Sequence, residues 1–443
     1  MKAWGPDRIA RAAGASLLSQ TGVNRGPERI TIDSRDAGPG ALFVGLSGSS
    51  ADGGTFAPAA LTAGAWGVLT KPEHAQAAGG AVVLAADDPL KALQQLAAAW
   101  REELGATVVG ITGSTGKTTT KDILLALLTP ARRTVASRAN FNTEIGLPLE
   151  ILAAPGGTEV LVLEHAMRGK GQIAELAAIS RPDVAVVVNV GPVHLELLGT
   201  IEAIAAAKAE LIEALEPGDT AIVPAGEPLL DRFLRAEIEV MTFGPGGDVD
   251  FTHDGEVEVR GQTIALEVPF EQAHLRTDLL AAVAAAVAAG VTPSGRVEVA
   301  LSPGRGQRLK LPDGITLIDD SYNANPTSMR AALDELARSA AGARSVAVLG
   351  DMLELGPAER HFHRQIGVHA RDLEVDVLVT VGHLAAEIGD AFEGDSYAVA
   401  DSSEAAALVP ELLEPGDFVL VKASRGVGLE LVAEALHAGE EAA

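Results

Sequence analysis

The 443-residue sequence has no cysteine and is short of positive charge. The absence of a thiol excludes cysteine catalysis, cysteine-ligated metal and disulfides, which suits a reducing compartment. Lys and Arg number 34 against 60 Asp and Glu, a formal net charge of −26. This balance argues against nucleic acid as a partner. An anionic ligand such as a nucleotide must therefore meet local Lys and Arg side chains and helix N-termini.

Long apolar runs are also missing. The longest, Leu279–Val291, is alanine-rich and about 13 residues long, too short to span a bilayer. The N-terminus has no basic segment followed by an apolar stretch, the pattern of a signal peptide. We therefore expect a soluble, cytoplasmic protein with no membrane insertion, and the length predicts about three domains. A monomer is a separate expectation, which these observations do not decide.

Short β-branched runs alternate with alanine-rich helical stretches, which predicts an α/β protein. The pattern divides into an N-terminal domain over 1–104, a central domain over 105–302 and a C-terminal domain over 303–443. The linker between the last two is predicted at Ser302–Gly306. In the first domain we predict strands at 29–33, 41–45, 66–70 and 81–85, a helix at 56–63, and a helix at 89–104 that Asp88 caps.

The central domain shows the βαβ rhythm of a mostly parallel sheet, with predicted strands at 107–111, 159–164, 184–190 and 220–224. Residues 249–268 read instead as an antiparallel insertion with a turn at 253–256. The helix at 275–290 closes this domain. The C-terminal domain repeats the pattern, with strands at 315–318, 345–349, 375–381 and 417–421, and a helix from Pro326 to Arg338 that Asn325 caps.

The segment T-G-S-T-G-K-T-T at Thr112–Thr119 lies between a predicted strand and the helix at 118–128. In such a turn, backbone N–H groups and the helix dipole cradle phosphate. Lys117 can reach the terminal phosphates, and the Thr118 hydroxyl can ligate Mg²⁺. Ile111 occupies the place of the first glycine of the full pattern, so the loop is a shortened variant. The predicted nucleotide contacts are Gly113, Ser114, Thr115, Gly116, Lys117, Thr118 and Thr119. A glycine-rich turn with a chance Lys-Thr is the alternative, which the flanking strand and helix disfavour.

Lys208 lies in the middle of the apolar face of the predicted helix within 200–217, four residues after Ile204 and four before Ile212. Desolvation there lowers the pKa of a lysine and leaves a neutral amine, which can take up CO₂ as a carbamate and so become a metal-binding carboxylate. From this helix alone, a lysine that extends past the edge of the apolar face to water is the favoured alternative.

Glu164 and His194 lie at or just after the ends of two predicted parallel strands. Ligands bind at the carboxyl ends of strands in open α/β sheets. A carboxylate and an imidazole beside a phosphate loop suit Mg²⁺ or Mn²⁺. Nearby, the loop with Asn140, Asn142 and Thr143 can recognise a polar substrate, or it serves only as a turn and a helix cap.

The C-terminal domain contributes further candidates. Asp319 follows a strand and can bind a ribose hydroxyl, with Asn323 and Asn325 in the same loop. Upstream, Arg305 and Arg308 lie in the linker region, where a guanidinium can clamp phosphate on domain closure. Ser424 and Arg425 follow the last strand and can contact a substrate carboxylate. Solvated loop charges are the alternative for each.

Several longer segments carry a resemblance over nearly the whole chain: D-S-R at 33–35, G-A-L-F-V-G-L at 40–46, T-G-S-T-G-K-T at 112–118, N-F-N-T-E-I-G-L-P at 140–148, M-R-G-K-G-Q-I at 167–173, I-D-D-S-Y-N-A-N-P-T-S-M at 318–329, L-G-D-M-L-E-L-G at 349–356 and K-A-S-R-G at 422–426. Together they resemble the Mur ligase family, the ATP-dependent amino-acid and peptide ligases of peptidoglycan precursor synthesis. The segments at 318–329 and 349–356 are typical of the members that add D-alanyl-D-alanine.

The resemblance implies a UDP-binding N-terminal domain, a central ATPase domain and a Rossmann-like C-terminal domain that receives a dipeptide. It implies a ligase that uses ATP and Mg²⁺ (or Mn²⁺) to join D-alanyl-D-alanine to UDP-N-acetylmuramoyl-tripeptide through an acyl phosphate. The implied roles are uridine-nucleotide recognition for Ser34 and Arg35, metal ligation for Thr118, Glu164, His194 and a carbamylated Lys208, ribose binding for Asp319 and phosphate contact for Arg308.

Four positions depart from the family pattern. Gly54 stands at a common histidine, His165 follows Glu164 where methionine or leucine is usual, Thr143 replaces an asparagine, and Asp278 stands at an adenine-contacting asparagine. Three rival functions remain: a sister ligase of the same fold such as folylpolyglutamate synthase, a phosphate-loop switch or kinase without ligase activity, and a scaffold. The scaffold gives no reason for Lys117, Glu164, His194 and Lys208 together.

Overall fold

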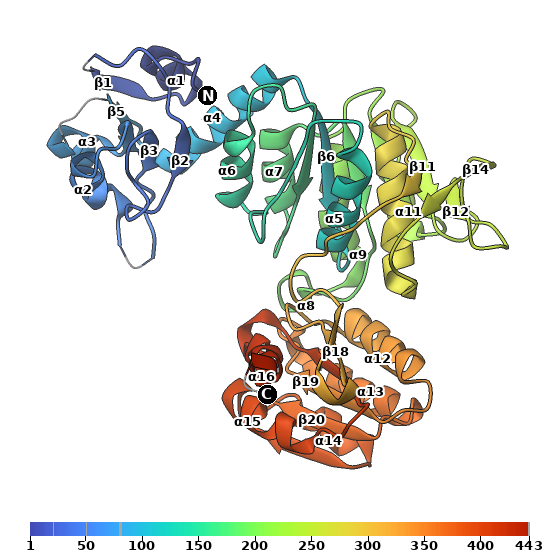
Figure 1. Cartoon of the computed structure of the whole chain (residues 1–443). Coiled ribbons are helices and arrows are strands. Elements are labelled where there is room, and N and C mark those ends of the chain that lie inside the picture. Colours follow the sequence, from blue (N-terminus) through green and yellow to red (C-terminus); the bar gives the residue numbers. More distant parts are fainter. Residues whose placement is uncertain (21, 50, 79–81, 442–443) are drawn as a thin grey trace.

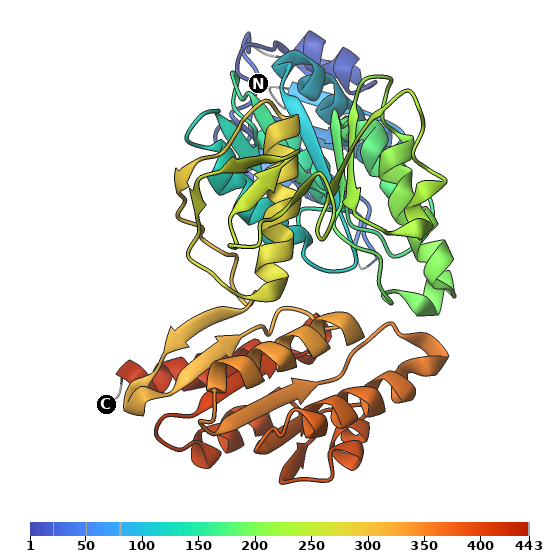
Figure 2. The same cartoon turned by 90° about the vertical axis from the view of Figure 1, so that its right-hand side faces the viewer.

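The chain forms three α/β domains, each built on its own mainly parallel sheet, in a computed structural model that describes all residues except 21, 50, 79–81 and 442–443. Figures 1 and 2 show the C-terminal domain at one end of the central domain, with the N-terminal domain beyond helix α4 (Pro89–Leu104). Among the described residues, none forms a helix that is both long and apolar enough to cross a membrane.

The N-terminal sheet has the order β1-β5-β4-β3-β2, in which β1 alone runs antiparallel. Its strands β3 and β4 are buried along their length, as the apolar runs predicted. The predicted strand at 81–85 is present from Val82, and residue 81 lies outside the described part of the chain. The elements are α1 (Pro6–Ala12), β1 (Ser16–Gln20), β2 (Arg29–Thr31), β3 (Ala41–Val44), α2 (Ala57–Thr62), β4 (Gly67–Thr70), α3 (Pro72–Ala78) and β5 (Val82–Ala85).

The central sheet has the order β14-β13-β12-β11-β10-β9-β6-β8-β7. The antiparallel insertion predicted at 249–268 is confirmed for β12, β13 and β14, which pair antiparallel. The end of that range differs, because β15 (Leu266–Glu267) pairs parallel with β16 (Gly295–Arg296) in a separate two-stranded sheet. The elements are β6 (Thr107–Thr112), α5 (Lys117–Leu128), β7 (Thr134–Ala136), α6 (Gly146–Ala153), β8 (Val160–Glu164), α7 (Gln172–Ser180), β9 (Val184–Val187), α8 (Leu195–Leu198), α9 (Ile201–Glu213), β10 (Thr220–Pro224), α10 (Pro228–Asp231), β11 (Glu239–Phe243), β12 (Val249–Phe251), β13 (Val257–Val259), β14 (Gln262–Ile264) and α11 (Ala273–Ala288).

The order of the central sheet brings the candidate residues together. Strand β6 lies between β8 and β9, and all three run parallel. Their carboxyl ends therefore meet at one edge of the sheet, where the phosphate loop follows β6, Glu164 ends β8 and His194 follows β9.

The C-terminal sheet has the order β17-β18-β22-β19-β20-β21, parallel except for the edge strand β17. The elements are β17 (Gln307–Lys310), β18 (Thr316–Asp319), α12 (Pro326–Ala340), β19 (Ser345–Gly350), α13 (Glu359–Asp372), β20 (Val377–Val381), α14 (Ala386–Phe392), β21 (Ser396–Val399), α15 (Ser402–Leu412), β22 (Phe418–Lys422) and α16 (Glu430–Glu441). Asn325 caps α12 as predicted, and Ser328 completes a capping box.

Helix α4 joins the first two domains through a shared apolar core. Asp88 caps it as predicted, and its buried residues pack on both α1 and the central helices α6 and α7. Trp100 meets Trp4 edge-to-face at 5.4 Å and donates its indole N–H to Ala154 O. Because this core holds residues from both sides of position 104, the domain boundary placed there remains a prediction.

Candidate active site

The phosphate loop has the predicted strand–turn–helix form. Gly116 precedes α5 with φ +76°, and a Cβ there would lie 2.3 Å from Asp278 Oδ1. Both the positive φ and the close approach of Asp278 require glycine. The amides of the first turn of α5 have no partner within the helix, so this end of the helix is suited to an anion.

Asn189 holds the loop in shape, and the sequence pattern did not indicate it. Its Oδ1 accepts from the N–H groups of Ser114 and Thr115 at 3.0 and 2.9 Å, and its Nδ2 donates to Thr115 Oγ1 at 2.7 Å. Strand β9 was predicted to run to Val190, which concealed Asn189 inside a strand. The strand ends at Val187, because Asn189 bonds to the neighbouring loop instead of continuing the ladder.

Lys117 is folded back on its own loop, with Nζ donating to Gly113 O at 2.7 Å. Burial lowers the pKa of Lys117 to about 8, an effect that Glu164 opposes and Arg305 adds to. Among the described residues, Glu164 is the only carboxylate that raises the pKa of Lys117. A bound γ-phosphate would add negative charge beside the ammonium and stabilise its charged form.

Glu164 is 1% exposed and forms the centre of the cluster. Its Oε2 accepts from Thr118 Oγ1 at 3.3 Å and from Asn142 Nδ2 at 3.4 Å. Its Oε1 is buried with no hydrogen-bond partner among the described residues. Lys121, which the sequence pattern also missed, has Nζ 3.8 Å from that oxygen and 3.0 Å from Asp122. A buried carboxylate oxygen that accepts no hydrogen bond from the described residues, beside a threonine hydroxyl, fits a hard divalent cation.

Lys208 is 2% exposed. The alternative in which its side chain extends past the edge of the apolar face to water is therefore wrong. Burial lowers the pKa of Lys208 well below its usual range, and nearby Lys117 lowers it further. No hydrogen bond to Lys208 Nζ is found among the described residues. Burial and the absence of a hydrogen bond from these residues both favour the neutral amine, the state from which a carbamate forms.

His194 precedes α8 in the left-handed conformation, with φ 53°. Its Nδ1 contacts a carboxylate oxygen of Glu354, which comes from the C-terminal domain. Burial lowers the pKa of His194, Glu354 opposes the shift, and Lys117 and Lys208 add to it. The imidazole is thus within electrostatic reach of both lysines of the site.

The His, Asp and Glu side chains of the described chain do not by themselves form a metal site. Within the described ranges, no group of three or more His, Asp or Glu side chains could hold a metal ion. Glu164 and Thr118 fit the ion as oxygen donors, and a carbamate on Lys208 would add a further pair of oxygens. Nucleotide phosphates would complete such a site.

Two arginines near the linker occupy different surroundings. Arg305 donates from Nη2 to Thr118 Oγ1 at 3.1 Å, lies over the Tyr322 ring, and has a buried Nε without a partner in the described structure. Arg308 lies in strand β17 rather than in the linker, and it is bound to Glu335 and Ser339 of α12. The structure therefore brings Arg305, and not Arg308, to the phosphate loop.

The other candidates of the C-terminal domain make local contacts. Asp319 accepts from Ser321 Oγ at 2.6 Å, while its neighbour Asp320 binds Lys422 at 2.5 Å. Lys422 also donates to Asn323 O. Ser424 is buried and bonds to Leu353 and Ala324, while Arg425 pairs with Glu430.

The remaining candidates lie elsewhere. Arg35 is bound to Asp33 at 2.5 Å and lowers the pKa of that carboxyl to about 2, and Ser34 lies beside them after β2. Asn140 and Asn142 lie in the turn before α6, and Thr143 Oγ1 accepts from Gly146 N at 3.5 Å. Within the part of the chain that the structure describes, Asn142 is the one of these candidates that bonds to the Glu164 cluster.

Two departures from the family pattern have structural counterparts. A side chain at Gly54 would collide with His74, since a Cβ would lie 2.3 Å from that ring. His165 is fully buried, and its Nε2 is 2.9 Å from Ser180 Oγ. Burial lowers the pKa of His165 to about 4, so it is a neutral core residue. Successive side chains of a strand point to opposite faces of the sheet, so His165 lies on the other face from Glu164 and outside its cluster.

Asp278 gives a testable prediction, because burial raises its pKa well above the usual range while Arg305 opposes the shift. The folded state then holds a proton that the unfolded chain loses near pH 4, so stability falls as pH rises above about 4. Asp278→Asn removes this dependence. The melting temperature of Asp278→Asn minus that of wild type should therefore increase from pH 5 to pH 8. A difference between the two melting temperatures that does not change with pH would contradict this.

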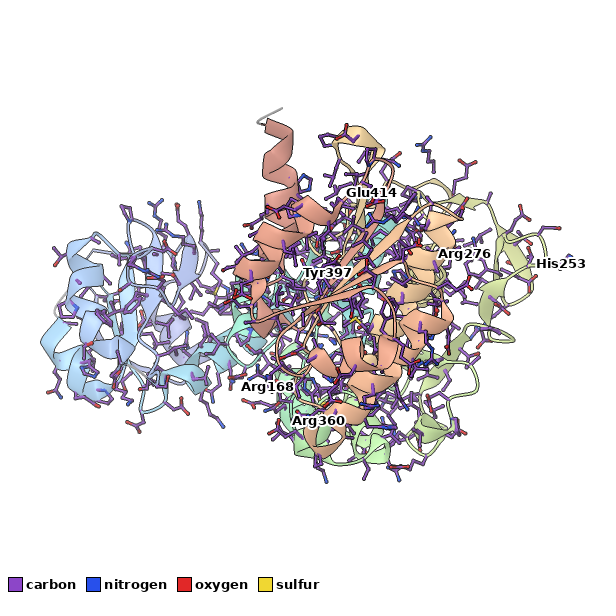
Figure 3. The ribbon with its side chains drawn as sticks, turned by 90° about the horizontal axis from the view of Figure 1, so that it is seen from below. Arg168, His253, Arg276, Arg360, Tyr397 and Glu414 are labelled. Carbon is purple, nitrogen blue, oxygen red and sulfur yellow. The ribbon has the colours of Figure 1, made fainter. Side chains whose placement is uncertain are left out.

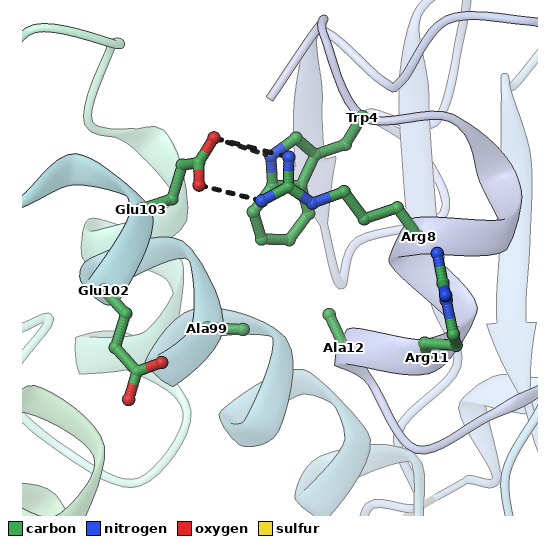
Figure 4. A pocket seen from close by; sticks show the side chains of 7 residues that line it. All are labelled: Trp4, Arg8, Arg11, Ala12, Ala99, Glu102 and Glu103. Carbon is green, nitrogen blue, oxygen red and sulfur yellow. Dashed lines mark hydrogen bonds and ion pairs between the residues drawn. The ribbon is translucent and has the colours of Figure 1, made fainter.

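A surface hollow lies away from this cluster. This hollow, of about 540 Å³, lies between α1 and α4. Figure 4 shows Arg8 bound to Glu103 across it and stacked on Trp4. Among its charged lining residues, Arg8 pairs with Glu103 and Glu102 pairs with Arg181. None of its lining residues belongs to the phosphate-loop cluster.

A phosphate loop leads into a cluster that holds a buried carboxylate, a buried lysine of lowered pKa and an arginine from the next domain. This combination defines a nucleotide-dependent enzyme of the phosphate-loop class. Residues 28–101, 111–289 and 304–425 match, in order, the families described as Mur ligase family, catalytic domain; Mur ligase middle domain; and Mur ligase, glutamate ligase domain. The chain belongs to the Mur ligase family.

Among its relatives are two proteins named UDP-N-acetylmuramoyl-tripeptide–D-alanyl-D-alanine ligase. The Bacillus subtilis protein is 36% identical over 92% of each chain, and the Synechocystis protein is 37% identical over 95% of each. MurF from Acinetobacter baumannii has a TM-score of 0.85 at 28% identity, covering 98% of this chain and 99% of that one. MurF from Thermotoga maritima, solved with ADP, has 0.80 at 30% identity, covering 94% and 98%.

Proposed function

We propose that this protein is an ATP-dependent ligase that joins D-alanyl-D-alanine to the carboxylate of UDP-N-acetylmuramoyl-tripeptide, giving the pentapeptide precursor of peptidoglycan. One observation carries the proposal: the chain is similar over nearly its full length to ligases of that name. The cluster around Glu164 and the phosphate loop is consistent with it, since it offers groups for ATP and a divalent cation.

The proposed division of labour follows the three domains, 1–104, 105–302 and 303–443. The first holds the UDP part of the substrate, with Ser34 and Arg35 as candidate contacts. The central domain binds ATP, and the third receives the dipeptide near Asn325, Ser424 and Arg425. Asn140, Asn142 and Thr143 would face the peptide, and Asp319 and Asn323 the ribose.

In the first step, the tripeptide carboxylate attacks the γ-phosphorus, the bond to the β-phosphate oxygen breaks, and ADP leaves. Lys117 and Arg305 offset the charge that develops on the transferred group. In the second step, the dipeptide amine attacks the acyl carbon, loses a proton and expels phosphate. Because water would hydrolyse the acyl phosphate, closure of the C-terminal domain about Ser302–Gly306 belongs to the proposal.

Mg²⁺ or Mn²⁺ is the proposed cation, held by Thr118, Glu164, His194 and a carbamate on Lys208. When bound, it would withdraw charge from the phosphate oxygens. The site residues contribute the remaining parts: Glu164 and the carbamate supply anionic oxygens, and Asn189 holds the loop amides in register. We also propose a monomer that works in the cytoplasm, where ATP and the nucleotide-linked substrate are available.

A phosphate-release assay with the nucleotide-linked tripeptide and a panel of dipeptides tests the proposal. We expect phosphate only when both substrates are present, with D-alanyl-D-alanine preferred over its L,L isomer and over glutamate acceptors. Tripeptides that end in diaminopimelate or in lysine identify the third residue. Rapid phosphate release without a dipeptide would contradict the ligase and favour a phosphate-loop switch or kinase. Preference for a glutamate acceptor would favour a sister ligase such as folylpolyglutamate synthase.

A further inference from the structure

Glu354 of the C-terminal domain reaches across to the central domain and bridges two of its loops. It lies in the turn after β19, between Gly350 and the short 3₁₀ turn Gly356–Ala358. One carboxylate oxygen contacts His194 Nδ1, in the loop after β9, and the other is 3.6 Å from Arg168 Nε, in the loop after β8. Figure 3 labels Arg168 beside the ribbon of the C-terminal domain.

The backbone of the turn that holds Glu354 also contacts the backbone of the segment after β9. Glu196 N donates to Glu354 O at 3.4 Å, and a Cβ at Gly356 would lie 3.1 Å from Glu196 Cα. The domain contact therefore does not depend on the side chains alone.

Both partners of the central contact have an uncommon backbone. His194 has φ 53° and Glu354 has φ 63°, the left-handed region that non-glycine residues rarely adopt. Such conformations persist where the surrounding structure holds them, and they gather at functional sites. Here the two residues lie opposite each other, on loops from different domains, and each conformation brings its side chain to the other.

The contact decides which imidazole nitrogen is available. A carboxylate that pairs with an imidazole accepts from its N–H, so the contact with Glu354 favours the neutral tautomer of His194 with the proton on Nδ1. Nε2 then carries the lone pair, which is the form of histidine that binds a metal ion. Carboxylates that accept from a ligand histidine in this way fix its tautomer and its ring orientation.

We propose that Glu354 is a positioning residue for His194, which holds the imidazole in the tautomer with a free Nε2. The metal site of the central domain is then completed by a residue of the C-terminal domain, so cation affinity depends on the docking of that domain. This inference rests on the proposed role of His194 as a metal ligand.

The test measures Mn²⁺ binding to the full chain by electron paramagnetic resonance, with a non-hydrolysable ATP analogue present. We expect Glu354→Gln and Glu354→Ala to weaken Mn²⁺ binding about 10- to 100-fold, with Glu354→Asp intermediate. Affinity for the ATP analogue at saturating Mn²⁺ should stay near wild type. Arg168→Ala should bind Mn²⁺ as wild type does, since the effect acts through His194.

A matched control is Glu374→Gln. Glu374 is an exposed glutamate of the same domain, with the same left-handed conformation (φ 56°), at the end of α13. Its substitution should leave Mn²⁺ affinity and phosphate release unchanged. In metal-free protein labelled with ¹⁵N-histidine, the His194 resonances, assigned through His194→Asn, should report a protonated Nδ1 in wild type and a tautomer mixture in Glu354→Ala.

Two outcomes would overturn the inference, and they are distinguishable. If His194→Ala weakens Mn²⁺ binding while Glu354→Ala does not, Glu354 has no positioning role and the proposed metal site stands. If neither substitution changes Mn²⁺ affinity, His194 is not a ligand, and that part of the proposed function fails with the inference.

Discussion

Lys208→Ala is expected to lower ligase activity by about 100-fold or more, because it removes an anionic group of the proposed metal site. Lys208 is buried in α9, and this burial lowers its pKa well below the usual range, which favours the neutral amine that can form a carbamate. If the carbamate is the working group, formate or acetate should diffuse into the space left by the side chain and partly restore phosphate release from the variant.

Lys121→Ala is the control for that rescue. Lys121 is a second buried lysine of the same site, but its ammonium is bound to Asp122 and Ser137. Loss of activity in this variant should not be restored by short carboxylic acids, since its role is that of a cation. Activity of Lys208→Ala near wild type, or equal rescue of both variants, would contradict the carbamate.

The two arginines near the linker should differ sharply in their effects. We expect Arg305→Ala to lower kcat/KM about 100- to 1000-fold, since its guanidinium lies against Thr118 with a free Nε and faces charge that develops during phosphoryl transfer. Arg305→Lys should restore little, because an ammonium cannot reproduce the planar fork of donors.

Arg308→Ala is the matched variant. Its side chain binds Glu335, which keeps a second partner in Arg338, so we expect near-normal kcat/KM and a loss of stability of about 1 kcal/mol or less. Steady-state kinetics and thermal unfolding of the two variants decide the matter. A larger kinetic loss for Arg308→Ala than for Arg305→Ala would restore the phosphate role that the family resemblance implied for Arg308.

Much of the fold could be predicted because its signals are local. The helix at 89–104, the strand at 220–224 and the cap at Asn325 depend on residues within a few positions of one another, and all three are found as predicted. Edge elements such as β1 and β17 were missed, because their mixed polar sequences carry little apolar alternation and they are set by pairing with distant strands.

The candidate site divides in the same way. The Thr112–Thr119 loop, Glu164 and Lys208 were predicted, since each follows from a strand end or a helix face. Asn189 and Lys121 were missed because their roles depend on partners in other segments. Asn189 binds a loop 74 or 75 positions away. The strand predicted at 184–190 included Asn189, so its side chain was not considered as a loop contact.

The sequence by itself determined that this chain has a phosphate loop on a parallel sheet and that it resembles the Mur ligases, because those signals are contiguous motifs. Only the tertiary structure decided which groups meet at the loop. Arg305 reaches Thr118 across 187 positions, and Glu354 reaches His194 across 160. Contacts at such separations depend on the order of strands and the docking of domains, which no local pattern of residues encodes.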